Sequence, residues 1–216
     1  MKKILITGGA GYIGATLASL ALQKGFKVAA VDNLKHSKKE FVSKFSKNKN
    51  YTFFKCDINN LPNFEKILKK EKADIVVHLA GIVGDPASKL QKKLTKITNI
   101  QSSKKLFKLC EKYNVAKFIF SSTCSNYGIV NTKSLANENS KLKPLSLYAE
   151  TKVDFEKFMI QQSKNINMKL TIMRFATVFG VSDRMRFDLT INQFTRDLYL
   201  NKKLDIFGQN TWRPYC

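Results

Sequence analysis

The start of the chain constrains the fold most, because a short apolar run, Lys3–Thr7, leads directly into the glycine-rich turn "GGAGYIG". Gly8, Gly11 and Gly14 are spaced so that the backbone can turn tightly, approach a bound pyrophosphate and bring a helix close to the strand. The first turn of that helix offers free N–H donors and a partial positive charge. A glycine pattern alone is weak evidence, so the prediction depends on the rest of the chain.

Short runs rich in Val, Ile and Phe alternate with longer segments of helical period, which is typical of βαβ units in a parallel sheet. The expected strands are Lys3–Thr7, Lys27–Val31, Thr52–Lys55, Ile75–His78, Phe118–Ser121 and Leu170–Arg174. The expected helices are Tyr12–Gln23, Asn63–Glu71, Thr95–Tyr113 and Leu147–Ser163. The sequence therefore predicts an α/β fold, a Rossmann-like doubly wound parallel sheet.

The pattern changes after Gly180, where an arginine-rich loop precedes a predicted helix at Thr190–Leu200 and a short predicted strand at Leu204–Gly208. We expect residues 1–180 to form the nucleotide-binding domain and residues 181–216 to begin a smaller substrate domain. The last residues, "TWRPYC", include no polar tail or closing helix. We therefore expect this second region to be truncated, with a compact natural terminus as the alternative.

Composition is typical of a soluble globular protein with one main domain, since 44% of the 216 residues are hydrophobic and 25% are charged. No apolar run approaches the roughly 18 residues of a membrane-spanning helix. The four cysteines have no CxxC spacing and there are two isolated histidines, so we expect no metal site. Reduced thiols favour a cytoplasmic location.

The formal net charge of +22 raises the question of nucleic-acid binding, because clustered lysine and arginine neutralise phosphates. The lysines here are spread over nearly every expected helix and loop, which favours a solvated coat and argues against a nucleic-acid partner. Binding to RNA or another polyanion stays as an alternative that a steep salt dependence would reveal. Small anionic substrates would be attracted in either case.

An acidic residue, Asp32, follows the second expected strand, where its carboxylate can accept hydrogen bonds from both ribose hydroxyls of a dinucleotide. No arginine stands beside it in the sequence, so its charge disfavours a 2′-phosphate, and we predict NAD over NADP. Asn33 is expected to assist. Asp57, after the third strand, is placed to reach the adenine amino group or is a surface turn residue.

The segment "YAETK" places Tyr148 and Lys152 four residues apart, on one face of an expected helix. An ammonium group near a phenol stabilises the phenolate, so we expect Lys152 to lower the pKa of Tyr148 towards neutrality. Such a tyrosine could exchange a proton with a substrate alcohol. The YxxxK spacing also occurs by chance and carries no weight alone.

Taken in order, "TGGAGYIG", the acidic end of the second strand, "HLAG", Asn99, "SSTCSNYG" and "YAETK" resemble the extended short-chain dehydrogenase/reductases. More narrowly, they resemble the NAD-dependent epimerase/dehydratase family, which acts on nucleotide sugars. The resemblance implies a Rossmann domain followed by a small C-terminal substrate domain. The residues expected at the NAD site are Gly8, Gly11, Tyr12, Ile13, Gly14, Asp32, Asn33, Asp57, Ile58, Leu79, Ala80, Gly81, Asn99, Ser121, Ser122, Tyr148 and Lys152.

Within "SSTCSNYG" the resemblance assigns chemistry to the third position, Thr123, as in members of the UDP-galactose 4-epimerase type. Its hydroxyl would bond the oxygen at the reacting sugar carbon while Tyr148 moves the proton. Ser121 and Ser122 would shape the strand end and the nicotinamide pocket. Nothing recognisable lowers the pKa of Cys124, so we interpret it as a packing residue.

The resemblance also separates the family's reactions. Its 4,6-dehydratases carry an Asp-Glu pair after the threonine, where this chain has Cys124 and Ser125, which cannot eliminate water at neutral pH. An epimerase needs Thr123, Tyr148 and Lys152, and so does a net oxidoreductase. We favour epimerisation of a UDP-hexose or UDP-uronate, with a dehydrogenase or reductase and a non-catalytic NAD-binding relative as alternatives.

Segments near the C-terminus resemble the nucleotide-sugar binding segments of the family. By that match Asn192 holds the diphosphate, Phe207 lies near the nucleobase and Arg213 pairs with a phosphate, since an arginine fork suits phosphate well. Thr177 stands where many members have Asn, which changes the expected sugar pocket. The expected substrate is a nucleotide sugar, most simply a UDP sugar.

Two arginines, Arg184 and Arg186, could pair with a phosphate or bind a sugar carboxylate, and surface salt bridges are an equally good explanation. The resemblance suggests a homodimer paired through two helices, for which Thr95–Tyr113 and Leu147–Ser163 are the candidates. Packing of those apolar helix faces on the sheet explains them as well.

Overall fold

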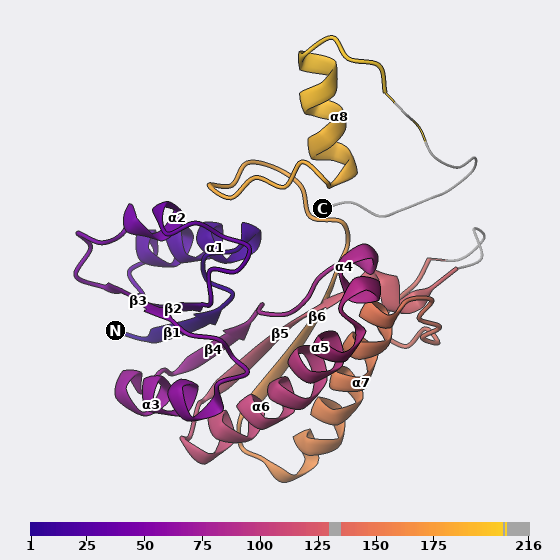
Figure 1. Ribbon diagram of the computed structural model, residues 1–216. Helices are drawn as coiled ribbons and strands as arrows, with labels where there is room; N and C mark the ends of the chain where they lie inside the picture. Colours follow the sequence, from indigo (N-terminus) through magenta and orange to yellow (C-terminus); the bar gives the residue numbers. More distant parts are fainter. Residues whose placement is uncertain (130–134, 205, 207–216) are drawn as a thin grey trace.

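Six parallel strands form one sheet in the order β3-β2-β1-β4-β5-β6 in the computed structural model, which describes residues 1–129, 135–204 and 206 (Figure 1). The strands are β1 (Lys3–Thr7), β2 (Lys27–Asp32), β3 (Tyr51–Lys55), β4 (Ile75–His78), β5 (Lys117–Thr123) and β6 (Lys169–Phe175). The order reverses between β1 and β4, as in dinucleotide-binding sheets. The predicted Rossmann-like fold is confirmed.

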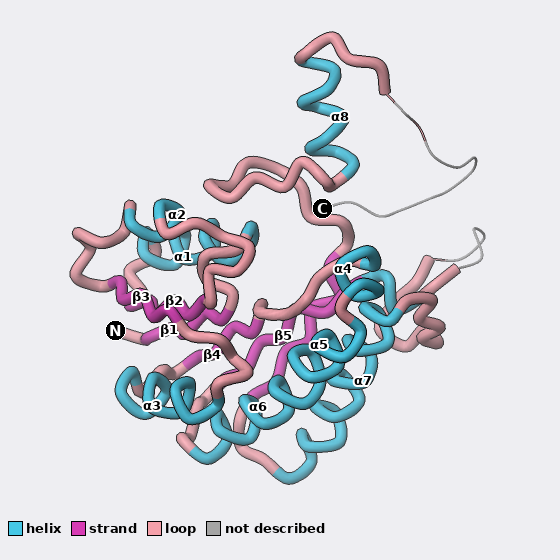
Figure 2. Tube along the Cα trace, viewed as in Figure 1, coloured by secondary structure: helices cyan, strands magenta, loops and turns pink. Residues whose placement is uncertain are grey.

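Helices cover both faces of this sheet (Figures 1 and 2). On one face lie α1 (Tyr12–Gln23) and α2 (Glu40–Ser43), and on the other lie α3 (Leu61–Glu71), α6 (Ser103–Lys112) and α7 (Leu147–Gln162). The other helical segments are α4 (Asp85–Leu90), α5 (Lys92–Lys96), a π-helical segment at Ile97–Ser102, 3₁₀ turns at Cys124–Tyr127 and Ser163–Asn165, and α8 (Thr190–Tyr199). After β6 the chain leaves the sheet and leads to α8 (Figure 1).

The central strands β1, β2 and β4 are buried on both faces, which explains why they read as continuous apolar runs. The larger core cluster contains phenylalanines of β5, α6 and α7, and Phe118, Phe107 and Phe155 are each fully buried. A smaller cluster fills the space between the sheet and α1, where Ala18 and Ala30 let the helix approach closely. The core therefore fixes α7 against the end of β5.

The expected helix Thr95–Tyr113 is interrupted, because the π-helical segment Ile97–Ser102 separates α5 from α6. Within the widened turn the Ser103 hydroxyl donates a hydrogen bond to the Thr98 carbonyl at 2.9 Å. Segments of this kind occur frequently at functional sites, and this one contains Asn99. Apolar periodicity does not distinguish a π turn from an α turn, so the sequence predicted one continuous helix.

Other differences are small. Helices α2 and α4 were not expected, since four and six residues are too few to show a helical period. Strand β5 continues past Ser121 to Thr123, so the segment "SSTCSNYG" begins inside the sheet. The strand expected at Leu204–Gly208 lies largely outside the described residues, and the described Leu204 and Ile206 are not in a strand.

No helix in the described part of the chain is long and apolar enough to span a membrane. Within the same residues, no three His, Cys, Asp or Glu side chains gather as a metal ion would require. Cys56 and Cys110 are buried free thiols. Burial raises the pKa of Cys110 strongly, so this thiol stays protonated and packs as an apolar side chain.

His78, at the end of β4, is a buried neutral base. Its ring nitrogens contact the Thr7 hydroxyl at 2.8 Å and the Ser103 hydroxyl at 2.9 Å. Burial lowers the pKa of His78 to about 3, and the charge of Lys152 lowers it further in the same direction. The folded protein therefore excludes a proton that the unfolded chain binds below about pH 6.5.

We expect His78 to make stability pH-dependent on the acid side. Its contribution is complete above about pH 6.5 and is lost, by about 1.4 kcal/mol per pH unit, as the pH falls towards its folded pKa. Urea unfolding of wild type and His78→Asn between pH 7 and pH 4.5 measures this, and the variant should show the shallower pH dependence. His36→Asn, at an exposed histidine, should match wild type; equal slopes for all three proteins would refute the assignment.

Candidate active site

Four polar side chains lie where parallel strands end at one edge of the sheet. Thr7 ends β1, Asp32 ends β2, His78 ends β4 and Thr123 ends β5. The carboxyl edge next to the reversal of strand order, here between β1 and β4, is where open α/β sheets bind ligands. The candidate site is therefore built along this edge.

The glycine-rich turn follows β1 and has no room for a side chain at Gly8, Gly9 or Gly14. Gly8 has a φ of +72°, and a Cβ on it would lie 2.9 Å from the Ala80 nitrogen. A Cβ on Gly14 would lie 2.1 Å from the Gly8 carbonyl oxygen. The turn thus brings bare backbone to the start of α1, a cradle that fits the pyrophosphate of a dinucleotide.

Asp32 lies against this turn. Its carboxylate accepts hydrogen bonds from the Ala10 N–H at 3.1 Å and from the Leu34 N–H at 2.8 Å. Asn33 donates to the Asp57 carboxylate at 2.9 Å, so the ends of β2 and β3 are linked. The predicted ribose and adenine residues therefore lie together, and Ile58, next to Asp57, is buried.

Asn99 holds the loop after β4. Its side chain accepts from the Ile82 N–H at 2.8 Å, donates to the Ile82 carbonyl at 3.0 Å and donates to the Thr151 hydroxyl of α7 at 3.2 Å. Leu79, Ala80 and Gly81 make up the start of this loop, and the Ala80 N–H donates to the Thr7 hydroxyl at 3.2 Å. Asn99 thereby joins the expected cofactor loop to the helix that carries Tyr148.

Tyr148 and Lys152 come from the first turns of α7, whose N-terminus is capped by the Ser146 hydroxyl at 3.3 Å from the Ala149 nitrogen. The Thr123 hydroxyl is close enough to the Tyr148 hydroxyl to lower the pKa of that phenol. The Lys152 ammonium donates to the Ser121 carbonyl at 2.8 Å and lies 5.7 Å from the centre of the Tyr148 ring. The structure therefore brings together all three side chains predicted to be catalytic.

The expectation that Lys152 lowers the pKa of Tyr148 is wrong for this structure. Burial raises the pKa of Tyr148 to about 12, although the nearby Thr123 hydroxyl and the charge of Arg186 act in the opposite direction. The ammonium of Lys152 is directed at the Ser121 carbonyl instead. Burial lowers the pKa of Lys152 to about 8, so the lysine is mostly protonated at neutral pH.

The segment after β6 is attached to the start of α1 through Tyr12. The Tyr12 hydroxyl donates to the Gly180 carbonyl at 2.7 Å and accepts from the Asn192 amide at 3.0 Å. The Ser182 hydroxyl donates to the Tyr12 carbonyl at 2.7 Å. Sequence reasoning placed Tyr12 in the cofactor site through its position in the turn and could not see this second role.

Asn192 is buried, and its amide also donates to the Arg186 carbonyl at 3.0 Å and accepts from the Gly180 N–H at 3.0 Å. Both N–H bonds of this side chain are therefore used within the protein. Thr177 is half-buried two residues after β6. Phe207 and Arg213, the other residues expected to bind substrate, lie outside the described residues.

Two arginines of this segment, Arg184 and Arg186, are far from the site residues in the sequence but come near them in the folded chain. Arg184 donates to the His36 carbonyl at 2.6 Å, and its charge interacts with that of Asp32. Arg186 pairs with Asp188, and its charge reaches Tyr148. Asp32 therefore has an arginine near it in space, although none stands beside it in the sequence.

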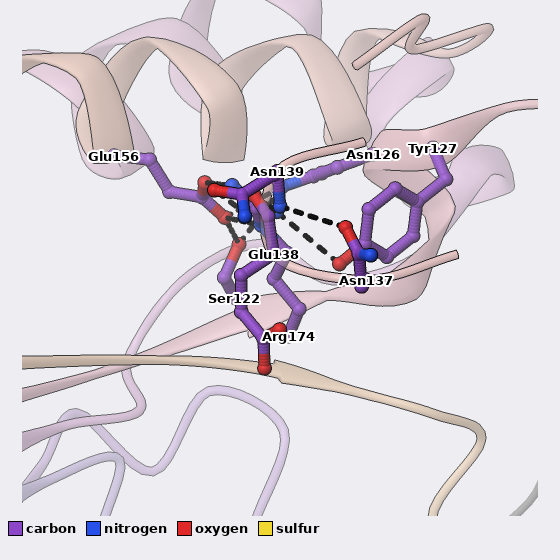
Figure 3. Close-up of polar contacts among 8 residues, drawn as sticks. All are labelled: Ser122, Asn126, Tyr127, Asn137, Glu138, Asn139, Glu156 and Arg174. Atoms are coloured by element: carbon purple, nitrogen blue, oxygen red, sulfur yellow. Dashed lines mark hydrogen bonds and ion pairs between the residues drawn. The ribbon is translucent and has the colours of Figure 1, made fainter. Parts of the chain in front are cut away.

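Ser122, expected in the cofactor site, has its hydroxyl directed into the protein, where it donates to the buried Glu156 carboxylate (Figure 3). Ser121 faces the site through its carbonyl, which accepts from Lys152. Successive residues of a strand point to opposite faces, so the two serines have different surroundings. Of the two serines predicted for the cofactor site, Ser121 therefore contacts Lys152 in the site and Ser122 contacts Glu156 behind it.

Comparison with known proteins agrees with this geometry. A UDP-glucuronate 4-epimerase from Thermodesulfobacterium geofontis is 30% identical over 217 residues, which cover 98% of this chain and 66% of that protein. The chain spans 62% to 66% of the length of three curated relatives that it matches.

Solved structures give the same result. The UDP-N-acetylglucosamine 4-epimerase of Methanobrevibacter ruminantium, in complex with UDP-N-acetylmuramic acid, superposes with a TM-score of 0.88 at 29% identity, covering 100% of this chain and 68% of that one. The UDP-glucuronic acid 4-epimerase of Bacillus cereus, in complex with UDP-glucuronic acid and NAD, gives 0.85 at 30% identity, covering 99% and 68%.

The profile of one family, described as the NAD dependent epimerase/dehydratase family, matches residues 4–216. This match agrees with the glycine-rich turn, with the predicted cofactor and with the strand order of the sheet. The chain belongs to the NAD-dependent epimerase/dehydratase family.

Proposed function

We propose that this protein is an NAD-dependent nucleotide-sugar epimerase that inverts C4 of a UDP-hexose or UDP-uronate. The observation that carries the proposal is the gathering of the Thr123 hydroxyl, the Tyr148 phenol and the Lys152 ammonium at the carboxyl edge of the sheet, with Lys152 5.7 Å from the centre of the Tyr148 ring. A pair of hydroxyls backed by a buried ammonium is suited to moving one proton on and off a sugar alcohol.

NAD fits the cradle described above. The turn from Gly8 to Gly14 and the start of α1 would hold the pyrophosphate, and Asp32 would accept hydrogen bonds from the ribose. When bound, oxidised NAD supplies a hydride acceptor and a positive charge on its nicotinamide ring. The preference for NAD over NADP was predicted from the charge of Asp32, and Arg184 lies near that charge. Direct titration with both cofactors therefore tests the preference.

The protein's own groups would divide the work at the sugar. Thr123 would hold the oxygen on the reacting carbon, and the Tyr148 hydroxyl would take its proton and later return it. Because burial raises the pKa of Tyr148 to about 12, the phenolate that could accept a proton is hardly populated at neutral pH, and Tyr148 needs additional positive charge nearby to act as a base. Arg186 already acts in this direction on Tyr148, whereas the Lys152 ammonium, mostly protonated at neutral pH, is directed at the Ser121 carbonyl.

Two other reactions of the family are alternatives to epimerisation: water elimination and net oxidation or reduction of the sugar. Cys124 and Ser125 stand where a dehydratase would need an acid and a base, which argues against water elimination. A net dehydrogenase or reductase would use the same Thr123, Tyr148 and Lys152. The relatives named as 4-epimerases favour inversion over net redox change.

We assign residues 181–204 to the substrate-binding region on the contacts that join them to the site. The charge of Arg186 acts on the Tyr148 phenol. Arg186 is therefore near enough to the site to recognise an anionic group of the substrate. A sugar carboxylate is one such anion, and a phosphate is another. Asn192 keeps this segment attached to Tyr12.

Proton NMR tests the function. The protein, produced to the natural stop codon of its gene, is incubated with NAD and UDP-glucose, and separately with NAD and UDP-glucuronate. A new anomeric doublet from the 4-epimer, without accumulation of reduced cofactor, is the expected result. Accumulation of reduced cofactor would identify a dehydrogenase, and unchanged spectra with NAD bound would reject 4-epimerisation of these two sugars.

A further inference from the structure

A buried carboxylate lies directly behind the candidate catalytic residues. Glu156 is on α7, one helical turn after Lys152, and is 1% exposed. A carboxylate in such a place is costly to bury unless it is paired and hydrogen-bonded. Its partners therefore indicate why it is there.

The partners of Glu156 come from three other elements (Figure 3). Ser122, on β5, donates its hydroxyl hydrogen to the carboxylate, and Asn126, in the 3₁₀ turn after β5, donates its amide at 2.8 Å. Arg174, on β6, donates through Nη2 at 2.8 Å and through Nε at 3.1 Å. One carboxylate thus ties the ends of β5 and β6 to α7.

The position of Ser122 gives this network a consequence for the site. Ser122 stands between Ser121, whose carbonyl accepts from Lys152 at 2.8 Å, and Thr123, whose hydroxyl is close enough to Tyr148 to lower its pKa. A shift of the Ser122 side chain would move both neighbours relative to α7. The hydrogen bond to Glu156 opposes that shift.

Arg174 extends the network to the loop that precedes α7. Its Nη1 donates to the Tyr127 hydroxyl at 3.2 Å and to the Glu138 carbonyl at 3.1 Å. Its guanidinium carbon also lies 5.2 Å from the centre of the Tyr127 ring. Ser122, near the start of the "SSTCSNYG" segment, and Tyr127, near its end, are therefore both hydrogen-bonded to the Glu156–Arg174 pair.

We propose that Glu156 is a positioning residue of the active site, which holds the end of β5 in register with α7 so that Ser121 and Thr123 meet Lys152 and Tyr148. The inference rests on the proposed function, because a change in turnover is informative only if the protein is an epimerase. The position of Lys152 and its charge can be measured without turnover.

The charge of Glu156 also acts on Lys152. The groups facing the Lys152 ammonium are the Ser121 carbonyl and the Phe120 ring from β5, neutral His78 from β4, and Tyr148 and Glu156 from its own helix. Burial lowers the pKa of Lys152 and the negative charge of Glu156 raises it. Glu156 therefore keeps the ammonium protonated at neutral pH.

The test replaces Glu156 with Gln and compares it with Asp154→Asn, the same loss of charge at an exposed residue of the same helix. The titration of Lys152 is followed by NMR of carbon-13-labelled lysine, with its signal identified by its absence in Lys152→Met. We expect the Lys152 pKa to fall by about one pH unit in Glu156→Gln and to be unchanged in Asp154→Asn.

Kinetics provide the second measurement. We expect kcat to fall by about 10- to 100-fold in Glu156→Gln with KM little changed, because positioning of the catalytic groups is lost and substrate contacts are kept. Ser122→Ala removes one hydrogen bond while leaving the buried charge pair, so kcat should fall about fivefold with the Lys152 pKa unchanged.

Each outcome decides the proposal. If Lys152 titrates at the wild-type pH in Glu156→Gln, or if Ser122→Ala keeps the wild-type kcat, the assignment is overturned. Ser122→Ala decides the question if Glu156→Gln does not fold. A wild-type protein that turns over no nucleotide sugar contradicts the proposed function, and the lysine titration then still tests the role of Glu156.

Discussion

Replacing Tyr148 with Phe is expected to lower kcat for nucleotide-sugar epimerisation by about 10²- to 10⁴-fold, the usual contribution of a positioned acid–base group. The change removes one oxygen atom, the phenol oxygen on which the Thr123 hydroxyl acts. NAD affinity should stay within about twofold, since the ring and the helix remain. Initial rates by NMR and NAD binding by calorimetry measure the two quantities.

Tyr113→Phe is the matched control, because it removes the same atom from a tyrosine at the end of α6 whose hydroxyl bonds Glu65. That variant should epimerise at the wild-type rate. If Tyr148→Phe retained more than about a tenth of the wild-type kcat, the proton would be moved by another group and the role given to Tyr148 would be wrong.

Replacing Gly14 with Ala is expected to weaken NAD binding by about 10- to 100-fold. The added Cβ would lie 2.1 Å from the Gly8 carbonyl oxygen, so the turn must shift. An extra methyl group in a closely packed place costs about 1–3 kcal/mol, and each 1.4 kcal/mol is tenfold in affinity. Calorimetric titration with NAD measures the loss, and urea unfolding measures any accompanying loss of stability.

Ser19→Ala, a change further along the same helix α1, serves as the control and should bind NAD with wild-type affinity. An affinity for NAD within twofold of wild type in Gly14→Ala would mean that the close approach of the turn to α1 is not needed for the cofactor. The pyrophosphate cradle would then have to be sought elsewhere along the carboxyl edge.

The fold and the place of the site along the carboxyl edge of the sheet could be predicted because their sequence signals are local. Apolar runs gave all six strands to within two residues at each end, and the glycine spacing gave the turn before α1. The YxxxK spacing placed Tyr148 and Lys152 on one helix face, and the family resemblance selected Thr123. These patterns depend on neighbours in the sequence, so the chain itself displays them.

Features that the sequence could not show depend on contacts between distant residues. Tyr12 and Asn192 are 180 positions apart and share a hydrogen bond, and Arg184 comes near Asp32 only through the path of the chain after β6. The raised pKa of Tyr148 results from burial, which a motif does not encode. Glu156 carried no motif, although a carboxylate one turn after Lys152 on the buried face of α7 was a usable signal.

The most direct test of the account follows a deuterium label at C4 of UDP-glucose and of UDP-glucuronate during incubation with the protein and NAD. Transient oxidation at C4 within one closed site predicts that the 4-epimer forms with the deuterium still on C4. Loss of the label to water during inversion, or conversion of the labelled sugar to a released ketone with stoichiometric reduced cofactor, would contradict an NAD-dependent 4-epimerase built around Thr123, Tyr148 and Lys152.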